Sequence, residues 1–124
     1  MYKREQLNER EVRFTIEEGE RECAHAITER EPQSSLFTSL GPSYKPTFYF
    51  WNFWVEKDLR RQGYGIKMLD YIKRYYKGCT IVLQVDSCGS MTNSQLIAYY
   101  QRNGFKRVTP DWYLSGYPLM VMEL

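Results

Sequence analysis

The 124-residue sequence has few of the residues that build metal centres and disulfide frameworks. It holds three cysteines and one histidine, and none of the cysteines has the CxxC or CxxH spacing of a zinc site. We therefore expect free thiols in a reducing cytoplasm and no bound metal. A long apolar run is also missing, which argues against a membrane-spanning helix, and the charged N-terminus does not resemble a signal peptide.

An excess of one charge is missing as well. Seventeen basic and fifteen acidic residues leave a net charge of +2, which is too small to indicate nucleic-acid or membrane binding by charge alone. What the sequence does contain is 43% hydrophobic residues, many of them aromatic. A chain of this size and composition can bury one core, so we expect a single α/β domain over residues 1–124.

The first thirty residues predict a polar start followed by a β-hairpin. Residues 1–10 carry few apolar side chains, which favours a frayed or short helical segment. The segments 12–16 and 22–30 then alternate with the period of half-buried strands. Gly19 lies between them in an acidic turn, so we expect the hairpin to close there.

The aromatic run Thr47–Val55 predicts a central strand with both faces covered. It follows a loop predicted over residues 32–46, a length that is typical of lids over functional sites. Apolar residues then recur at helical spacing over residues 66–76, and Cys79–Val85 predicts a buried strand. Strand, helix and strand in this order predict a right-handed βαβ crossover.

The last third of the chain predicts a second helix and two closing strands. Thr92 and Gln95 have the spacing of a capping box at a helix start. Gly104 is placed to end that helix in the left-handed conformation. Residues 105–108 and 119–124 predict the final strands.

The turn between the aromatic strand and the first helix combines the features of an anion site. It reads Arg60-Arg-Gln-Gly63-Tyr-Gly65. The two glycines can adopt backbone angles closed to other residues and allow a ligand to approach the main chain. The helix that begins there leaves its first N–H groups unpaired at the positive end of its dipole, and the arginines add fixed charge. The pattern therefore predicts a phosphate-binding turn.

These residues, in this order, resemble the GNAT superfamily of acyl-CoA-dependent N-acyltransferases. The glycine turn matches the family's pyrophosphate motif, Arg/Gln-x-x-Gly-x-Gly/Ala. A second signature, Asn93 followed by Tyr100 and then by Gly104-Phe105, also matches. The resemblance covers residues 47–108. It implies an α/β fold of the α+β kind, with a mixed, mostly antiparallel central sheet and a βαβ acetyl-CoA-binding core flanked by helices.

The resemblance also implies a role for each motif residue. The main chain of Phe53 and Val55 would pair with the pantetheine arm of acetyl-CoA as an added strand, and Asn93 would contact the same arm. Tyr100 would protonate the leaving thiolate, which suits a phenol that is protonated at neutral pH. The pyrophosphate would lie on the turn formed by Arg60, Arg61, Gln62, Gly63, Tyr64 and Gly65.

The implied activity is transfer of an acetyl group from acetyl-CoA to a primary amine of a small molecule or a peptide, without a metal and with both substrates bound together. One alternative is a GNAT fold that binds CoA without turnover. Another is a stacking platform for single-stranded RNA, which leaves the glycines at the helix start unexplained. The acceptor and the subunit organisation, monomer or homodimer, stay open.

The sequence departs from the family on the acceptor side. The chain has too few residues before Val12, and too tight a hairpin after it, for the two helices that usually follow the family's first strand and help to bind the acceptor. We therefore expect the 32–46 loop to form that wall. His25 is more often a structural strand residue than a catalytic base. The general base stays open among three carboxylates near strand ends, which are Glu56, Asp58 and Asp86.

Overall fold

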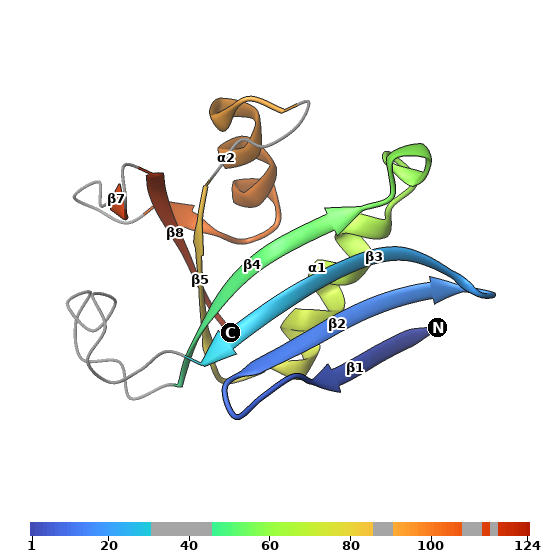
Figure 1. The fold of residues 1–124 in the computed structure, drawn as a ribbon. Helices are drawn as coiled ribbons and strands as arrows, with labels where there is room; N and C mark the ends of the chain where they lie inside the picture. Colours follow the sequence, from blue (N-terminus) through green and yellow to red (C-terminus); the bar gives the residue numbers. More distant parts are fainter. Residues whose placement is uncertain (31–45, 86–90, 108–112, 115–116) are drawn as a thin grey trace.

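The computed structural model describes residues 1–30, 46–85, 91–107, 113–114 and 117–124. Within these ranges the strands form a mixed sheet in the order β1-β2-β3-β4-β5-β8-β6, and β7 pairs with β8 beside this path (Figure 1). The strands are β1 Tyr2–Gln6, β2 Glu11–Glu18, β3 Arg21–Arg30, β4 Thr47–Val55, β5 Thr80–Gln84, β6 Lys106–Arg107, β7 Tyr113–Leu114 and β8 Tyr117–Glu123. The helices are α1 Tyr64–Tyr75 and α2 Asn93–Arg102, and a 3-10 turn, η2, spans Lys57–Leu59.

Strand direction agrees with the sequence prediction of a mostly antiparallel sheet. Neighbouring strands run antiparallel except β4 and β5, which are parallel and joined through α1. The predicted βαβ crossover and the hairpin closed at Gly19 are both confirmed. The predicted 32–46 loop, apart from Pro46, and the base candidate Asp86 lie outside the described residues.

The prediction of a frayed or helical start is wrong. Residues Tyr2–Gln6 form β1, which pairs along its whole length with β2. All five side chains of β1 are exposed, although Tyr2 and Arg4 lie against the rings of Tyr71 and Tyr75 on α1. Because one of these two helix-facing residues is an arginine, the segment lacks the apolar–polar alternation that reveals a half-buried strand. Its backbone hydrogen bonds to β2 define the strand instead.

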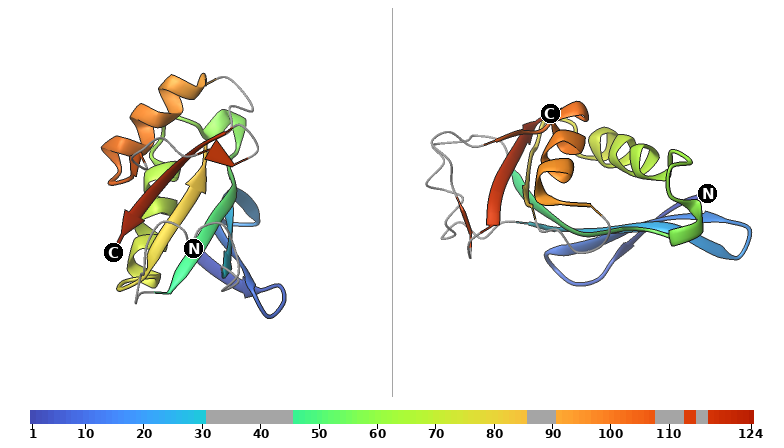
Figure 2. Two further views of the ribbon diagram at one scale, coloured as in Figure 1. Left: turned by 90° about the vertical axis from the view of Figure 1, so that its left-hand side faces the viewer. Right: turned by 90° about the horizontal axis from the view of Figure 1, so that it is seen from above.

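One hydrophobic core lies between the sheet and the helices. Both views in Figure 2 place α1 and α2 on the same side of the sheet. The core joins inward residues of the strands to the buried side of α1, and its largest members include Phe14, Phe50, Met68, Leu69, Ile72, Leu83, Phe105 and Met120. The prediction that β4 is covered on both faces is wrong at its centre, because Trp51 is 38% exposed and no described helix lies on that side.

A buried hydrogen bond ties α1 to the sheet across this core. The hydroxyl groups of Thr28 on β3 and Tyr76 at the end of α1 are hydrogen-bonded, and both side chains are buried. Burial raises the pKa of Tyr76 to about 12, although the Thr28 hydrogen bond acts in the opposite direction. The phenol therefore stays neutral in the folded protein under conditions in which it ionises in the unfolded chain.

This pKa predicts a loss of stability at high pH. Between about pH 10, where an unfolded tyrosine ionises, and pH 12, the free energy of unfolding should fall by roughly 2 to 3 kcal/mol through Tyr76. Tyr76→Phe should be less stable at pH 8, by ~1–3 kcal/mol, because Thr28 loses its partner. Urea unfolding at several pH values should then show that the difference in free energy of unfolding between the parent and Tyr76→Phe shrinks as the pH rises. A difference that stays constant up to pH 12 would contradict the raised pKa of Tyr76.

Candidate functional site

Strands β4 and β5 part in the middle of the sheet. Their parallel pairing joins Thr47–Phe50 to Thr80–Leu83 and then ends, and Figure 1 shows the two strands diverging beyond this point. From Trp51 to Val55, β4 keeps its pairing with β3 on one edge, while no described strand pairs with the other edge. Main-chain groups on that edge are therefore left for an added strand, apart from the Val55 oxygen, which accepts a hydrogen bond from Arg60.

A bulge in β4 coincides with the start of this opening. Opposite β3, the register places Asn52 and Phe53 against the single residue Ala26, and Asn52 adopts a positive φ of 52°. The extra residue changes which way the following side chains point. Phe53 and Val55 pack against the core, whereas Trp54 stacks on His25 with ring centroids 5.1 Å apart.

The glycine turn follows directly after the open edge, as the sequence predicted. Gly63 is the N-cap of α1 with a φ of 88°, and no side chain caps the helix. Its left-handed conformation favours glycine. Arg61 also has a positive φ, of 67°. Because the first turn of α1 carries no acidic residue and no side-chain cap, its N–H groups are available to an anion.

Arg60 links the turn to the strand. Its Nε donates a hydrogen bond to the main-chain oxygen of Val55 at 3.1 Å, and the other N–H groups of the guanidinium remain to meet an anion. Gln62 donates to the main-chain oxygen of Asp58 at 3.3 Å. The structure thus brings together Phe53, Val55 and the whole Arg60–Gly65 turn.

Helix α2 approaches this turn through Tyr99, a residue that the sequence analysis did not single out. A Cβ placed on Gly65 would lie 2.6 Å from the Tyr99 hydroxyl oxygen and 3.5 Å from Cζ of Phe53. A side chain at position 65 would therefore force the phenol of Tyr99 to move. Burial raises the pKa of Tyr99, so its hydroxyl is a protonated hydrogen-bond donor beside the start of α1.

Tyr100 is half-buried on the same helix. Its ring packs edge-on against Phe105, with centroids 5.5 Å apart, and against Tyr99 at 5.6 Å. Its main-chain oxygen accepts hydrogen bonds from the N–H groups of Asn103 and Phe105, both at 3.0 Å. The αL turn at Gly104 allows this arrangement, with a φ of 101°. The ring of Tyr100 is therefore held between Phe105 and Tyr99, the tyrosine that contacts the glycine turn.

Asn93 is the first residue of α2 and is exposed. The capping is done by Thr92, whose Oγ1 accepts a hydrogen bond from the N–H of Gln95 at 3.2 Å, while its own N–H donates to Oε1 of Gln95 at 2.9 Å. The predicted capping box is confirmed. Because Thr92 caps the helix, Asn93 is not needed for that purpose and its amide faces solvent.

Two of the candidate bases lie near the turn without a shared site. Glu56 is half-buried and follows β4 directly, and its N–H donates to the main-chain oxygen of Cys23. The exposed side chain of Asp58 forms an ion pair with Arg21. In the described ranges, no three His, Cys, Asp or Glu side chains come together as a metal site would need. Among these residues there is also no helix long and apolar enough to span a membrane.

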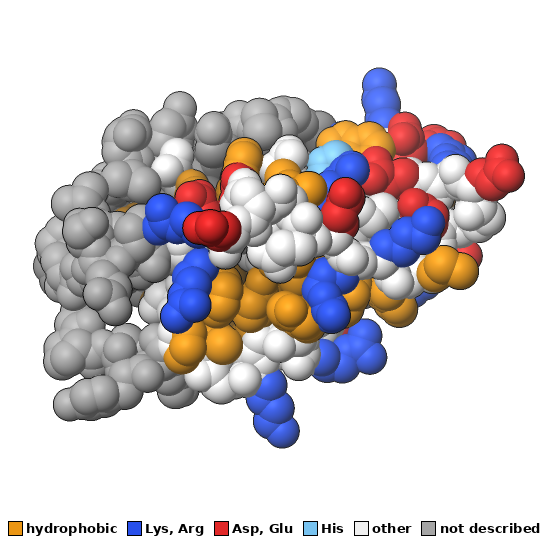
Figure 3. All heavy atoms as spheres, turned by 60° about the horizontal axis from the view of Figure 1, so that its bottom comes forward, with side chains coloured by type: hydrophobic (Ala, Val, Ile, Leu, Met, Phe, Trp, Pro, Cys, Tyr) orange, Lys and Arg blue, Asp and Glu red, His pale blue; other side chains and the backbone are white. Residues whose placement is uncertain are grey.

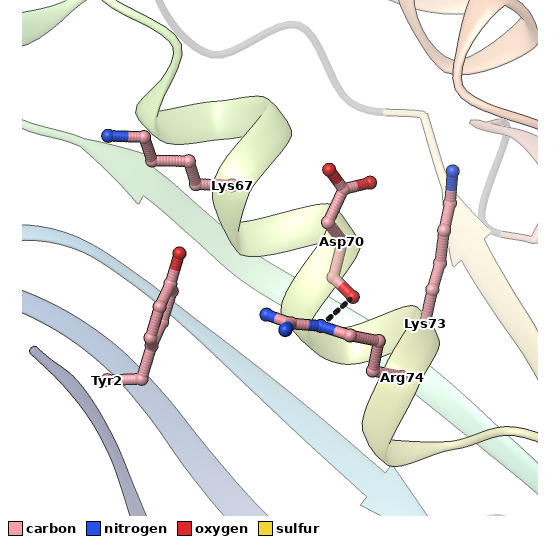
Figure 4. A pocket seen from close by; sticks show the side chains of 5 residues that line it. All are labelled: Tyr2, Lys67, Asp70, Lys73 and Arg74. Carbon is pink, nitrogen blue, oxygen red and sulfur yellow. Dashed lines mark hydrogen bonds between the residues drawn. The ribbon is translucent and has the colours of Figure 1, made fainter.

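A separate hollow of about 500 Å³ lies between β1 and α1. It is lined by Tyr2, Lys67, Asp70, Lys73 and Arg74, and Figure 4 shows Tyr2 and Arg74 pointing toward the same space while Lys73 points away. It is shallow and cationic, and it contains none of the residues predicted for the cofactor. The open edge of β4 and the glycine turn therefore form the candidate site, and this hollow does not belong to it.

Comparison with known proteins shows the family to which the chain belongs. The family model described as the acetyltransferase (GNAT) domain matches residues 11–107. The chain belongs to this GNAT acetyltransferase family. No curated protein matches the sequence significantly.

Solved structures share the fold at low sequence identity. Arabidopsis thaliana NAA60 in complex with acetyl-CoA superposes with a TM-score of 0.71 at 17% identity, over 94% of this chain and 78% of NAA60. The ribosomal-protein-S18-alanine N-acetyltransferase of Escherichia coli superposes with a TM-score of 0.64 at 22% sequence identity, over 94% of this chain and 70% of that protein. A Bacteroides thetaiotaomicron protein assigned to the GNAT family superposes with a TM-score of 0.64 at 21% sequence identity. The match covers 93% of this chain, which spans only 62% of that protein's length.

The contact between Gly65 and Tyr99 predicts a rescue. Gly65→Ala should destabilise the protein by ~1–3 kcal/mol, because the new methyl group meets the phenol oxygen. Adding Tyr99→Phe removes that oxygen and should restore part of the loss, which urea unfolding of the two single variants and the double variant would measure. An Ala variant as stable as the parent, or a double variant that shows only the sum of the single effects, would contradict the contact.

Proposed function

We propose that the chain transfers an acetyl group from acetyl-CoA to a primary amine while both substrates are bound. The observation that carries this proposal is the open edge of β4, which leads directly to an uncapped helix start at the glycine turn. An extended amide-bearing arm fits the edge, and a pyrophosphate fits the turn. The shared fold with an acetyl-CoA-bound structure supports the same assignment.

Each residue in this region would have a separate task. The main chain of Phe53 and Val55 would bond to the amides of the pantetheine arm, and the Arg60–Gly65 turn would hold the pyrophosphate. Asn93, with its exposed amide, would reach the arm from α2. Tyr99, whose hydroxyl lies against Gly65, would be a further hydrogen-bond donor at this end of the cofactor.

The chemistry needs positioning and two proton transfers. The neutral amine attacks the thioester carbonyl, the C–N bond forms and the C–S bond breaks. The amine gives up a proton to a base, and Tyr100 donates one to the leaving thiolate. A neutral phenol suits this step, since its ordinary pKa near 10 is close to that of a thiol. Most of the acceleration would come from holding the two reactants together.

Two features support an active enzyme over a binding-only relative. Tyr100 is present in the sequence motif that the resemblance assigns to the proton donor, and its neighbour on α2, Tyr99, packs against the glycine turn at Gly65. For the cellular location we propose the cytoplasm, because Cys23 and Cys79 are free thiols and free thiols are typical of reducing compartments.

Tyr100→Phe tests the proton donor. The variant keeps the ring and its packing on Phe105 but lacks the hydroxyl, so turnover with a good amine should fall by ~10²–10⁴, while acetyl-CoA affinity measured by calorimetry should change little. Tyr99→Phe is the matched control on the same helix. It should weaken acetyl-CoA binding and leave kcat within about tenfold.

Parent-like turnover by folded Tyr100→Phe would show that the residue only packs. An equal loss of kcat in the Tyr99→Phe control would remove the distinction between the two tyrosines and would contradict the assignment of the proton to Tyr100.

A further inference from the structure

Strand β1 has one unpaired edge within the described part of the chain. It is the first strand in the sheet order and pairs with β2 on its other side. Figure 1 shows it at the lower border of the sheet, with α1 behind. An unpaired edge is a place where another extended chain can add itself, so a fold has to cover such an edge, guard it with charges or use it.

The hydrogen bonds at the two ends of β1 show which of its main-chain groups face outward. The N–H of Glu17 donates to the main-chain oxygen of Met1 at 2.8 Å, and the N–H of Leu7 donates to that of Glu11 at 2.9 Å. Because antiparallel strands alternate between hydrogen-bonded and non-hydrogen-bonded pairs, the odd-numbered residues of β1 bond to β2. The outward N–H and C=O groups therefore belong to the even-numbered residues, which are Tyr2, Arg4 and Gln6.

Two charged side chains alternate with these outward groups and point to the sheet face opposite α1. Tyr2 and Arg4 lie against α1, so Lys3 and Glu5, one step along the strand, face the other way. Lys3 forms an ion pair with Glu17 at 2.9 Å and is still 54% exposed. None of the ion pairs within the described residues includes Glu5. The edge thus carries a lysine and a glutamate that a new partner can reach.

Antiparallel pairing of β1 with β1 of a second copy has one register that matches these charges. Outward groups must meet outward groups, so only the even-numbered residues can form the hydrogen-bonded pairs. With Arg4 opposite Arg4 of the second copy, Lys3 lies opposite Glu5 twice. A shift by two residues in either direction places Lys3 against Lys3 or Glu5 against Glu5, which is unfavourable. The sequence of the strand therefore favours one register and disfavours its neighbours.

The same register brings the charged side chains as close as a sheet allows. Lys3 and Glu5 fall in the non-hydrogen-bonded pairs, in which the Cα atoms are only ~4.5 Å apart. The main-chain hydrogen bonds form at the central Arg4 pair and at both pairs of Tyr2 with Gln6. Each outward group of β1 would then have a partner, and each charge would face its opposite.

Apolar side chains at the ends of β1 fit this pairing as well. Met1 is 73% exposed and Leu7 is 43% exposed. Centring the pairing on Arg4 places each of them opposite the other in the second copy. Figure 3, which brings this edge of the molecule forward, shows apolar side chains there with Lys and Arg side chains among them. Burying the two apolar pairs would add to the main-chain hydrogen bonds.

We propose that the chain forms a symmetric dimer in which β1 pairs antiparallel with β1 of a second copy, centred on Arg4, so that one sheet runs through both subunits. A two-fold axis through this pair makes the interface self-complementary and places the helices of both copies on the same side of the joined sheet. The open edge of β4 lies three strands away in the sheet order, so each copy keeps its own candidate site. The dimer does not depend on the acetyl transfer proposed above.

Two other roles for this edge fit less well. Charges often guard an edge against pairing, but that protection requires like charges to meet, and here Lys3 meets Glu5. A strand of a different protein could bond to the outward main-chain groups, but only a second copy matches the charges and the apolar ends by symmetry. The one unfavourable contact is between the two Arg4 side chains. Each guanidinium is held over its own Tyr75 ring, 4.3 Å from the ring centre.

Charge exchange between Lys3 and Glu5 tests the register. Sedimentation equilibrium of the parent from ~10 µM to ~1 mM should show a dimer with a dissociation constant on the order of 10–100 µM, in keeping with a small interface. Lys3→Glu and Glu5→Lys should each weaken the dimer by about tenfold or more, because both facing pairs become like charges. An equimolar mixture of the two variants restores opposite charges and should dimerise within about threefold of the parent.

The mixture also controls for effects inside one subunit. Lys3→Glu loses the ion pair with Glu17 whether the variant is alone or mixed, so an association that returns only in the mixture belongs to the contact between copies.

Arg4→Pro and Arg4→Ala separate main-chain pairing from side-chain charge. Proline removes an outward N–H that β2 does not use, which an edge strand tolerates, so the folded variant should stay monomeric up to ~1 mM. Alanine keeps the N–H and removes the facing like charges, so it should dimerise at least as tightly as the parent. If Arg4→Pro does not fold, the mixture of charge variants decides the question.

Amide hydrogen exchange identifies the edge that is used. The outward amides of Tyr2, Arg4 and Gln6 should exchange more slowly at high than at low protein concentration, whereas those of Lys3 and Glu5, which already bond to β2, should change little. A parent that is monomeric at ~1 mM, a mixture that associates no better than either charge variant alone, or a dimer with unchanged exchange at the outward amides would overturn the proposal. So would a dimer that folded Arg4→Pro leaves intact.

Discussion

Parallel pairing between β4 and β5 lasts for only four residues on each strand and ends at Phe50 and Leu83. Up to that point the two strands share one core layer. Beyond it, β4 pairs with β3, packs Phe53 and Val55 on the core, and accepts a hydrogen bond from Arg60 at Val55. An unpaired strand edge inside a sheet can form hydrogen bonds with another extended chain. In this molecule the edge points at an uncapped helix start, so an extended arm that ends in phosphates matches both features at once.

The surrounding structure keeps that opening in place. The bulge at Asn52 and Phe53 allows β4 to bend away from β5 without turning its apolar residues out of the core. On the helix side, the Tyr99 hydroxyl lies close to Gly65, so α2 packs beside the start of α1.

How far the sequence predicted the structure depended on whether a feature is local. The Arg60–Gly65 turn, the Thr92 capping box and the hairpin at Gly19 were predictable, because each is defined within a few residues by backbone preference and side-chain chemistry. β1 was not, since its side toward α1 carries Arg4 beside Tyr2 and so lacks the alternating pattern. The contact of Tyr99 with Gly65 depends on how α2 packs beside α1, and the side chains that β4 turns outward after the bulge depend on its register. A single bulge changes register, and the sequence pattern does not reveal it.

Amide hydrogen exchange with and without CoA tests the central claim most directly, because it reads the main-chain groups that the account assigns to the ligand. Binding of CoA should slow exchange at the amides of the open β4 segment, Phe53 and Val55, and at the first residues of α1 after Gly63. Protection confined to the hollow between β1 and α1, around Lys67 and Arg74, with the β4 edge unchanged, would contradict it.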